Sequence, residues 1–186
     1  MQTSKPLLKV NQVGIHFGGL KAVAEVSMEL FPGELCGLIG PNGAGKTTFF
    51  NLLTGVYIPS EGTIHLEDEK LNKLPPYKIT RKGISRTFQN IRLFGDLSVI
   101  DNVKVAYHSQ AKHSMFSSIV RLPTHFSGEK EMDQKAFDFL KIFNLETYRD
   151  EKAKNLPYGM QRRLEIARAL AANPRLLLLD EPAAGM

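Results

Sequence analysis

Cysteine is almost absent from this chain of 186 residues, which contains only Cys36. A single cysteine excludes an internal disulfide and any cysteine-rich metal site. Because Cys36 lies in the apolar segment 34–39, we expect its side chain to be a small part of the core. The five histidines lack the spacing that is typical of metal ligands, so a metal site built on histidine is not expected either.

Long hydrophobic runs are also missing. The longest, such as residues 176–179, have the length of a strand, whereas a membrane-spanning helix needs about 20 apolar residues. Residues 1–6 show no apolar core of a signal peptide, which indicates a cytoplasmic protein. With 42% hydrophobic and 23% charged residues, the chain can form one folded domain. Its net charge of +5 allows a nucleotide, a nucleic acid or an anionic membrane as partner.

The hydrophobic pattern predicts both strands and helices. Alternating apolar and polar residues predict antiparallel strands over 7–17 and 23–30. The other expected strands are 34–39, 62–66 and 175–180, and the expected helices are 47–53, 158–172 and a short one that follows Pro75-Pro76 and ends near Gly83.

The middle of the chain, about 98–155, is helical in character. One apolar stripe at helical spacing is expected to pack in the core and consists of Met132, Ala136, Phe139, Leu140 and Phe143. Residues 108–126 lack clear periodicity, which indicates a loop-rich insertion.

The strongest chemical signal is a glycine-rich loop between an apolar run and a helix. Its residues satisfy the pattern G-x-x-x-x-G-K-[ST] and are Gly40, Pro41, Asn42, Gly43, Ala44, Gly45, Lys46 and Thr47. The glycines let backbone N–H groups turn toward the β- and γ-phosphates of a nucleotide, and the following helix N-terminus favours the same charge. Lys46 supplies a cation, and the Thr47 hydroxyl supplies a ligand for Mg²⁺.

A second signal is an apolar strand that ends in two carboxylates. Residues 176–179 are all leucine and are followed by Asp180 and Glu181. We expect Asp180 to hold Mg²⁺, directly or through water, and Glu181 to polarise the attacking water as general base. Strands often end in acidic residues, so this pattern indicates ATP hydrolysis only in combination with the phosphate loop.

The segment just before the acidic strand resembles the signature motif of the ABC ATPase family. It reads Leu156-Pro157-Tyr158-Gly159-Met160-Gln161 and continues into a helix. The resemblance implies that residues of this segment bind the γ-phosphate of ATP held by the opposite subunit of a head-to-tail dimer, namely Tyr158, Gly159, Met160 and Gln161. Pro157, Tyr158 and Met160 depart from the commonest form of the motif, in which serine, glycine and glutamine are usual.

The resemblance assigns further residues to the nucleotide site. Phe17 stands where the family places an aromatic ring that stacks on adenine. Gln89 matches the glutamine that reaches Mg²⁺ and the attacking water, so that Glu181, Gln89 and Lys46 would form the catalytic set. The loop that binds the phosphates would run from Gly40 to Thr48.

The family resemblance also implies a fold. It is an α/β fold, a P-loop NTPase (RecA-like) core with an antiparallel β subdomain and a helical insertion subdomain. Within a single ABC-type ATP-binding domain, residues 1–97 would form the antiparallel sheet and the phosphate-loop core, 98–156 the helical subdomain, and 157–186 the signature helix and the acidic strand.

Residues 84–94 and 97–103, with the tyrosine form of the signature, look like the ATP-binding subunits of bacterial branched-chain amino-acid importers. The likeness implies a second ATP-binding subunit, integral membrane permease subunits that dock near Ile91 to Leu97, and a periplasmic binding protein as an indirect partner. It places the chain at the cytoplasmic face of the inner membrane, with no nucleic acid as partner. The transported amino acid is not indicated, because no residue of such a subunit contacts it.

Family members continue beyond the position that corresponds to Met186. They carry a further strand whose histidine touches the γ-phosphate, and none of the five histidines here stands in that place. That strand would lie between the phosphate-loop strand and the acidic strand, and unpaired backbone at a buried strand edge is costly. We therefore expect a C-terminally incomplete chain that hydrolyses ATP poorly by itself.

Two other functions stay open on the sequence alone. A soluble ABC-type ATPase that acts on nucleic acid shares the phosphate and signature motifs, but it usually carries long coiled-coil insertions or a second domain that 186 residues cannot hold. A nucleotide-binding module without turnover is the other, and only the missing C-terminal elements favour it.

Overall fold

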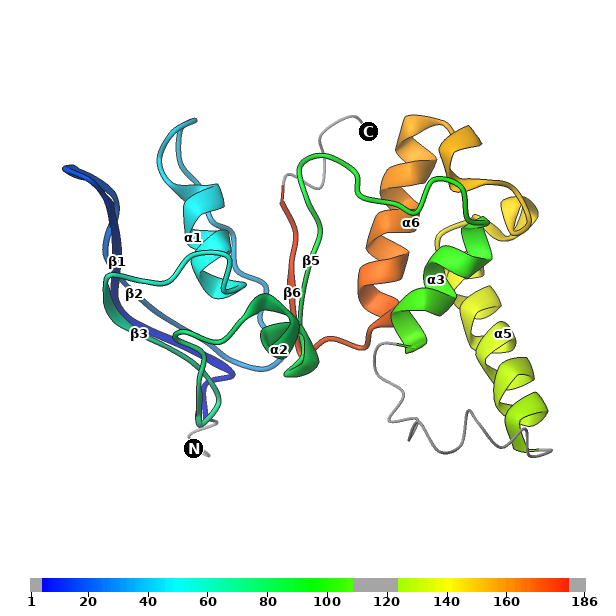
Figure 1. Ribbon diagram of the computed structural model, residues 1–186, viewed down its shortest axis with the longest axis horizontal. Coiled ribbons are helices and arrows are strands. Elements are labelled where there is room, and N and C mark those ends of the chain that lie inside the picture. The colour runs from blue at the N-terminus through cyan, green and yellow to red at the C-terminus, as the bar shows by residue number, and fades with distance from the viewer. Residues whose placement is uncertain (1–4, 109–123, 181–186) are drawn as a thin grey trace. The chain divides into compact units, whose positions relative to one another are not determined.

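The computed structural model describes residues 5–108 and 124–180. The chain forms two compact units, residues 1–82 and 83–186, whose elements are labelled in Figure 1. The first unit is built on an antiparallel sheet, and the second combines helices with a short parallel sheet. This mixture of helices and strands agrees with the predicted α/β class. The subdomain limits expected at 97/98 and 156/157 stay predictions.

The sheet of the first unit has four antiparallel strands in the order β2-β1-β3-β4. The strands are β1 Leu8–Phe17, β2 Leu20–Leu30, β3 Glu61–Leu66 and β4 Glu69–Lys70. On β1, the side chains of Val10, Val13 and Ile15 are buried. The alternation of apolar and polar residues therefore predicted β1 and β2 correctly, because one face of the sheet is covered. Strand β3 was expected as well, whereas β4 was not predicted.

Two helices complete the first unit, α1 Lys46–Leu53 and α2 Pro76–Arg81. α1 buries Phe49, Leu52 and Leu53, and α2 buries Ile79. Both helices were expected at these places. Proline at the first position of α2 is favourable, because its fixed φ suits a helix start and its missing N–H would have no partner there.

Residues 34–40 form no strand, so the prediction of a strand over 34–39 was wrong. Leu35 and Ile39 are 98% and 95% exposed, and Cys36 is exposed as well, which contradicts its expected burial. A continuous apolar strand is stable when neighbours pair with its edges and cover both of its faces. Among the described residues of the first unit, all strand pairing lies in the β2-β1-β3-β4 sheet, which leaves 34–40 without a neighbouring strand.

The described residues of the second unit form the parallel pair β5 and β6 and three α-helices. These elements are β5 Ile84–Arg86, α3 Val99–His108, α5 Thr124–Ile142, α6 Tyr158–Ala171 and β6 Leu176–Leu178, with two short 3₁₀-helices, η1 Glu146–Tyr148 and η2 Ala153–Asn155. Helix α6 and strand β6 were predicted, whereas β5 was not. The predicted insertion over 108–126 falls mostly on residues 109–123, which lie outside the described residues.

The core of the second unit lies among α3, α5 and α6. On α5, Ala136 and Leu140 are fully buried and Phe139 packs against the same cluster, as does Phe143 just after the helix. The predicted apolar stripe is therefore confirmed for these four residues, whereas Met132 is not part of the cluster. Within residues 5–108 and 124–180, none of the helices has the length and the apolar composition needed to cross a membrane.

Leu140→Ala is expected to destabilise the second unit strongly. The side chain is 0% exposed, so its truncation leaves a cavity that should lower the free energy of unfolding by about 2–5 kcal/mol. Ile142→Ala is the matched control, because Ile142 lies on the same helix and is 70% exposed. Urea denaturation followed by circular dichroism measures both variants, and equal losses of stability would contradict the packing described here.

Candidate functional site

The predicted phosphate loop makes a tight turn before α1. Gly43 and Gly45 have φ angles of 83° and 85°, a left-handed conformation that other residues rarely adopt. Space adds a second constraint at Gly45, because a Cβ there would lie 2.5 Å from the carbonyl oxygen of Ala22. The Ala44 N–H donates to the Pro41 carbonyl at 3.2 Å and closes the turn. Gly43 and Gly45 are thus required by the backbone itself.

Helix α1 begins at Lys46, directly after this turn. No side chain caps its N-terminus, so the helix dipole and the N–H groups of the first turn, which includes Thr47 and Thr48, favour an anion. The Lys46 ammonium donates to the carbonyl oxygens of Gly40 at 2.5 Å and Pro41 at 2.9 Å, which places it against the loop. A cation beside an uncapped helix start fits the phosphates of a nucleotide.

Phe17, the predicted partner of adenine, is the last residue of β1 and is 46% exposed. Its ring meets the ring of Tyr57 with centroids 5.2 Å apart and planes at 72°. The Tyr57 N–H donates to the Asn51 carbonyl of α1 at 3.1 Å, so the aromatic pair links β1 to the helix that follows the phosphate loop. A half-exposed ring supported by one aromatic neighbour can stack on a purine base.

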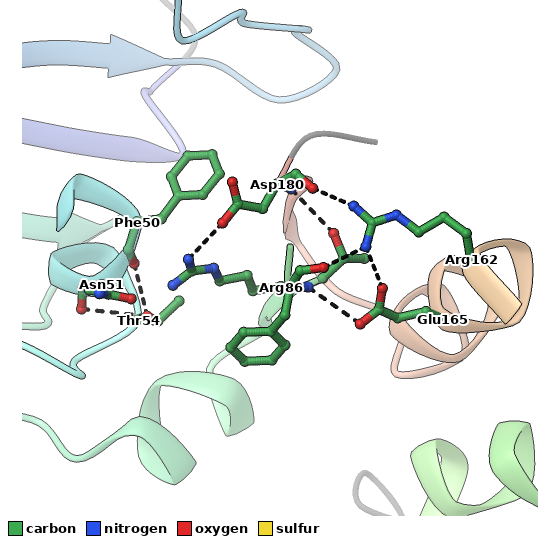
Figure 2. Close-up of polar contacts among 9 residues, drawn as sticks. Phe50, Asn51, Thr54, Arg86, Arg162, Glu165 and Asp180 are labelled. Carbon is green, nitrogen blue, oxygen red and sulfur yellow. Dashed lines mark hydrogen bonds and ion pairs between the residues drawn. The ribbon is translucent and has the colours of Figure 1, made fainter. Parts of the chain in front are cut away.

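Asp180, the predicted Mg²⁺ ligand, lies just beyond the end of β6 and is 8% exposed. Its carboxylate pairs with the Arg86 guanidinium of β5 at 2.9 Å, as Figure 2 shows. The Asp180 N–H donates to the Thr87 hydroxyl at 3.3 Å. The parallel pairing of β5 and β6 explains the ion pair, because it brings the carboxyl ends of both strands to the same edge. Glu181, the predicted general base, lies outside the described residues.

Two buried charged residues on α6 connect the segment around Gln89 to the end of β6. Arg162 and Glu165 are each 1% exposed and pair at 2.7 Å. Arg162 also donates to the backbone carbonyls of Phe88 and Asp180. Figure 2 shows the arginine between the carboxylate of Glu165 and the end of β6.

Gln89 lies in the irregular segment that follows β5 and is exposed. The Phe88 ring beside it has two guanidinium groups over it, Arg86 at 5.3 Å and Arg92 at 4.3 Å from the ring centroid. These cation–π contacts and the backbone bonds to α6 hold the segment on both sides of Gln89. Its predicted role toward Mg²⁺ stays a prediction.

The signature residues open helix α6. Pro157 precedes the helix and accepts the N–H of Met160 at 2.9 Å and of Gln161 at 3.0 Å through its carbonyl. Tyr158 is 51% exposed, and a Cβ at Gly159 would meet nothing within 4 Å. An uncapped, accessible helix start of this kind can bind an anion. The predicted contact with ATP of the opposite subunit stays a prediction.

Each unit contains part of the predicted set of site residues. The first contains Phe17 and the loop 40–48, and the second contains Gln89, Asp180 and the signature residues. Sequence reasoning did not single out Arg86, Arg162 or Glu165, because none of them belongs to a recognised motif position. A signal was present, since Arg162 and Glu165 interrupt the face of α6 that also carries buried residues.

Comparisons with known proteins agree with this geometry. The sequence profile of the family described as ABC transporter matches residues 23–184. The high-affinity branched-chain amino acid transport ATP-binding protein LivG of Escherichia coli is 49% identical over 183 residues, which make up 98% of this chain and 72% of LivG.

Solved structures show the same fold. The ADP conformation of MJ1267, an ATP-binding cassette of an ABC transporter, matches with a TM-score of 0.80 and 32% identity, over 98% of this chain and 71% of that one. The dimeric post-hydrolysis state of the cassette MJ0796, bound to ADP and Pi, matches with a TM-score of 0.77 and 28% identity, over 94% of this chain and 74% of that one. The predicted P-loop NTPase fold is confirmed. The chain belongs to the ABC transporter family and is one of its ATP-binding, ATP-hydrolysing subunits.

Proposed function

We propose that this subunit energises the import of branched-chain or related amino acids. The observation that carries the proposal is the 49% identity to LivG over 98% of this chain. The substrate itself is selected elsewhere in such an importer, by membrane subunits and a periplasmic binding protein. The contribution of this chain is to bind and hydrolyse ATP at the cytoplasmic face of the membrane.

ATP binding rests on the first unit. The backbone from Gly40 to Thr48 surrounds the β- and γ-phosphates, and Lys46 exchanges its loop carbonyl partners for phosphate oxygens. Phe17 stacks on adenine. The hydrogen bonds that Lys46 makes in the structure support this role, because they keep the ammonium beside the place where the charge of the phosphates arrives.

Hydrolysis adds residues of the second unit and of a partner subunit. Thr47, Gln89 and Asp180 present hydroxyl, amide and carboxylate oxygens, the ligand type that suits Mg²⁺. When bound, Mg²⁺ neutralises charge on the phosphates. Glu181 accepts a proton from the attacking water. In a head-to-tail dimer, homo- or heteromeric, the helix start at Tyr158 to Gln161 of one subunit faces the γ-phosphate on the other.

The permease subunits dock on segment 91–97. Phe94 and Leu97 are 49% and 40% exposed, and exposed apolar side chains favour a protein partner. The fully buried Asn102 amide holds both backbone groups of Phe94, at 2.9 and 3.1 Å. A hydrogen bond from Lys154 lowers the pKa of Asp96 below its ordinary value. A fixed backbone with two accessible apolar side chains supports docking.

The function is tested by transport into membrane vesicles. The subunit produced from its complete gene is reconstituted with its permease subunits and binding protein. ATP-dependent uptake of leucine, isoleucine or valine is the expected result, with no uptake of sugars. Uptake of none of these amino acids, together with salt-dependent binding to DNA or RNA, would instead support an ATPase that acts on nucleic acid.

Phe17→Ala should weaken ATP binding without changing phosphate binding. Loss of one stacking partner is expected to raise the Kd for ATP about tenfold, whereas the Kd for inorganic tripolyphosphate, which has no base, should stay the same. Leu20→Ala is the control, because Leu20 pairs with Phe17 across the turn and is 69% exposed. Isothermal titration calorimetry measures both ligands. An equal loss of affinity for both would show that Phe17 supports the loop rather than the base.

A further inference from the structure

The pair Arg162–Glu165 is a costly feature of helix α6. Both residues are 1% exposed, and a buried charge destabilises a protein unless it is paired and hydrogen-bonded. The two side chains form an ion pair between Arg162 Nη1 and Glu165 Oε2 at 2.7 Å. Their remaining bonds therefore indicate what this buried pair holds in place.

Glu165 holds the backbone on both sides of Gln89. Its second oxygen, Oε1, accepts the Phe88 N–H at 3.4 Å and the Arg92 N–H at 3.2 Å. One carboxylate oxygen thus clamps a short loop in which Gln89 is exposed. Hydrogen bonds to an ionised acceptor are stronger than those to a neutral one, so the charge of Glu165 matters for this clamp.

Arg162 extends the same clamp to the end of β6. One nitrogen, Nη1, donates to the Phe88 carbonyl, and the other, Nη2, donates to the Asp180 carbonyl (Figure 2). Phe88 is thus held at both of its backbone groups, the N–H by Glu165 and the carbonyl by Arg162. The bond to Asp180 fixes the backbone carbonyl of the predicted Mg²⁺ ligand.

We propose that Arg162 and Glu165 are positioning residues for hydrolysis. They set Gln89 against the end of β6, and they make Gln89 and the end of β6 move together with helix α6. The inference rests on the proposed roles of Gln89 and Asp180. Neither positioning residue needs to touch ATP. Because α6 begins with the signature residues, a displacement of this helix in the dimer would reach the hydrolytic groups through these two side chains.

Glu165→Gln separates positioning from nucleotide binding. The substitution removes the charge, so it weakens the clamp on Phe88 and Arg92 while it leaves the phosphate loop unchanged. We expect kcat to fall about tenfold, with the Kd for ATP changed by less than about twofold. Glu151→Gln is the control, because Glu151 is an exposed glutamate of the same unit and should keep both values. Wild-type kcat in Glu165→Gln would overturn the proposal.

A double variant separates positioning from stability. Arg162→Met with Glu165→Leu replaces the buried pair by apolar side chains of similar size, which often restores or raises stability. We expect a wild-type Tm with kcat still about tenfold low. Recovery of kcat together with Tm would overturn the proposal, because the pair would then serve stability alone.

A third variant decides the case if the double variant does not reach the wild-type Tm. Glu165→Asp keeps the charge beside Arg162 but shortens its reach to the two N–H groups. A low kcat at unchanged ATP affinity supports positioning, and wild-type kcat overturns it. The proposed function fails separately, because it fails if the unmodified subunit neither binds nor hydrolyses ATP.

Discussion

Lys46→Ala will weaken ATP binding by this subunit strongly. The ammonium lies 2.5 Å and 2.9 Å from two loop carbonyls, and no other lysine belongs to the phosphate loop. Charge-assisted bonds to phosphate are the strong ones, so we expect the Kd for ATP to rise about 100-fold, or roughly 3 kcal/mol. Equilibrium binding of a fluorescent ATP analogue measures the change.

The control for Lys46→Ala is Lys78→Ala. Lys78 is an exposed lysine on α2 of the same unit, so its removal changes the net charge equally without touching the loop. Its Kd should stay at the wild-type value. If both variants bound ATP equally well, the phosphate site would have to lie elsewhere.

Glu181→Gln will keep ATP and stop its hydrolysis. Glutamine has nearly the shape of glutamate but cannot accept a proton from water. Loss of a general base lowers the rate about 10²–10⁴-fold. In the proposed head-to-tail dimer ATP holds the two subunits together, so the variant should accumulate as a dimer with bound ATP. Size-exclusion chromatography with nucleotide analysis of the dimer peak measures both.

The comparison with Lys46→Ala makes this result specific. Lys46→Ala should lose nucleotide and dimer together, whereas Glu181→Gln should lose only turnover. The experiment requires the subunit produced from its complete gene, with permease subunits present when turnover is measured. Turnover of Glu181→Gln at the wild-type rate would remove Glu181 from the catalytic set.

The parts of the site that the sequence predicts are those under a local constraint. The phosphate loop is recognisable because its turn needs glycine at positions 43 and 45, where φ is positive. The stripe through Ala136 and Leu140 is recognisable because a helix that covers a core must repeat its apolar residues at 3.6-residue spacing. Both features can be recognised from a few neighbouring residues of the sequence.

The parts that the sequence does not predict depend on distant partners. Residues 34–39 read as a strand from composition, but a strand exists only with a neighbour, and the described residues provide none. Strand β5 was missed because its three residues, Ile84–Arg86, are too short to show a pattern, and pairing with β6 defines them.

The buried charges were missed for a related reason. Arg162 and Glu165 are close on the helix, and charged pairs at this spacing are common on exposed faces. Their burial depends on Phe88, Arg92 and Asp180, which lie 77, 73 and 18 residues from one or the other along the chain. Only the folded backbone brings these groups together.

Gly45 carries a consequence for genetic variation. Any missense codon at this position introduces a Cβ, and that atom would meet the backbone oxygen of Ala22, 2.5 Å away on the neighbouring strand. A carbonyl of a sheet strand cannot swing aside as a flexible side chain can. Loss-of-function alleles should therefore arise at codon 45 with every amino-acid replacement, even alanine, whereas codon 43, where a Cβ has open space, should yield milder alleles.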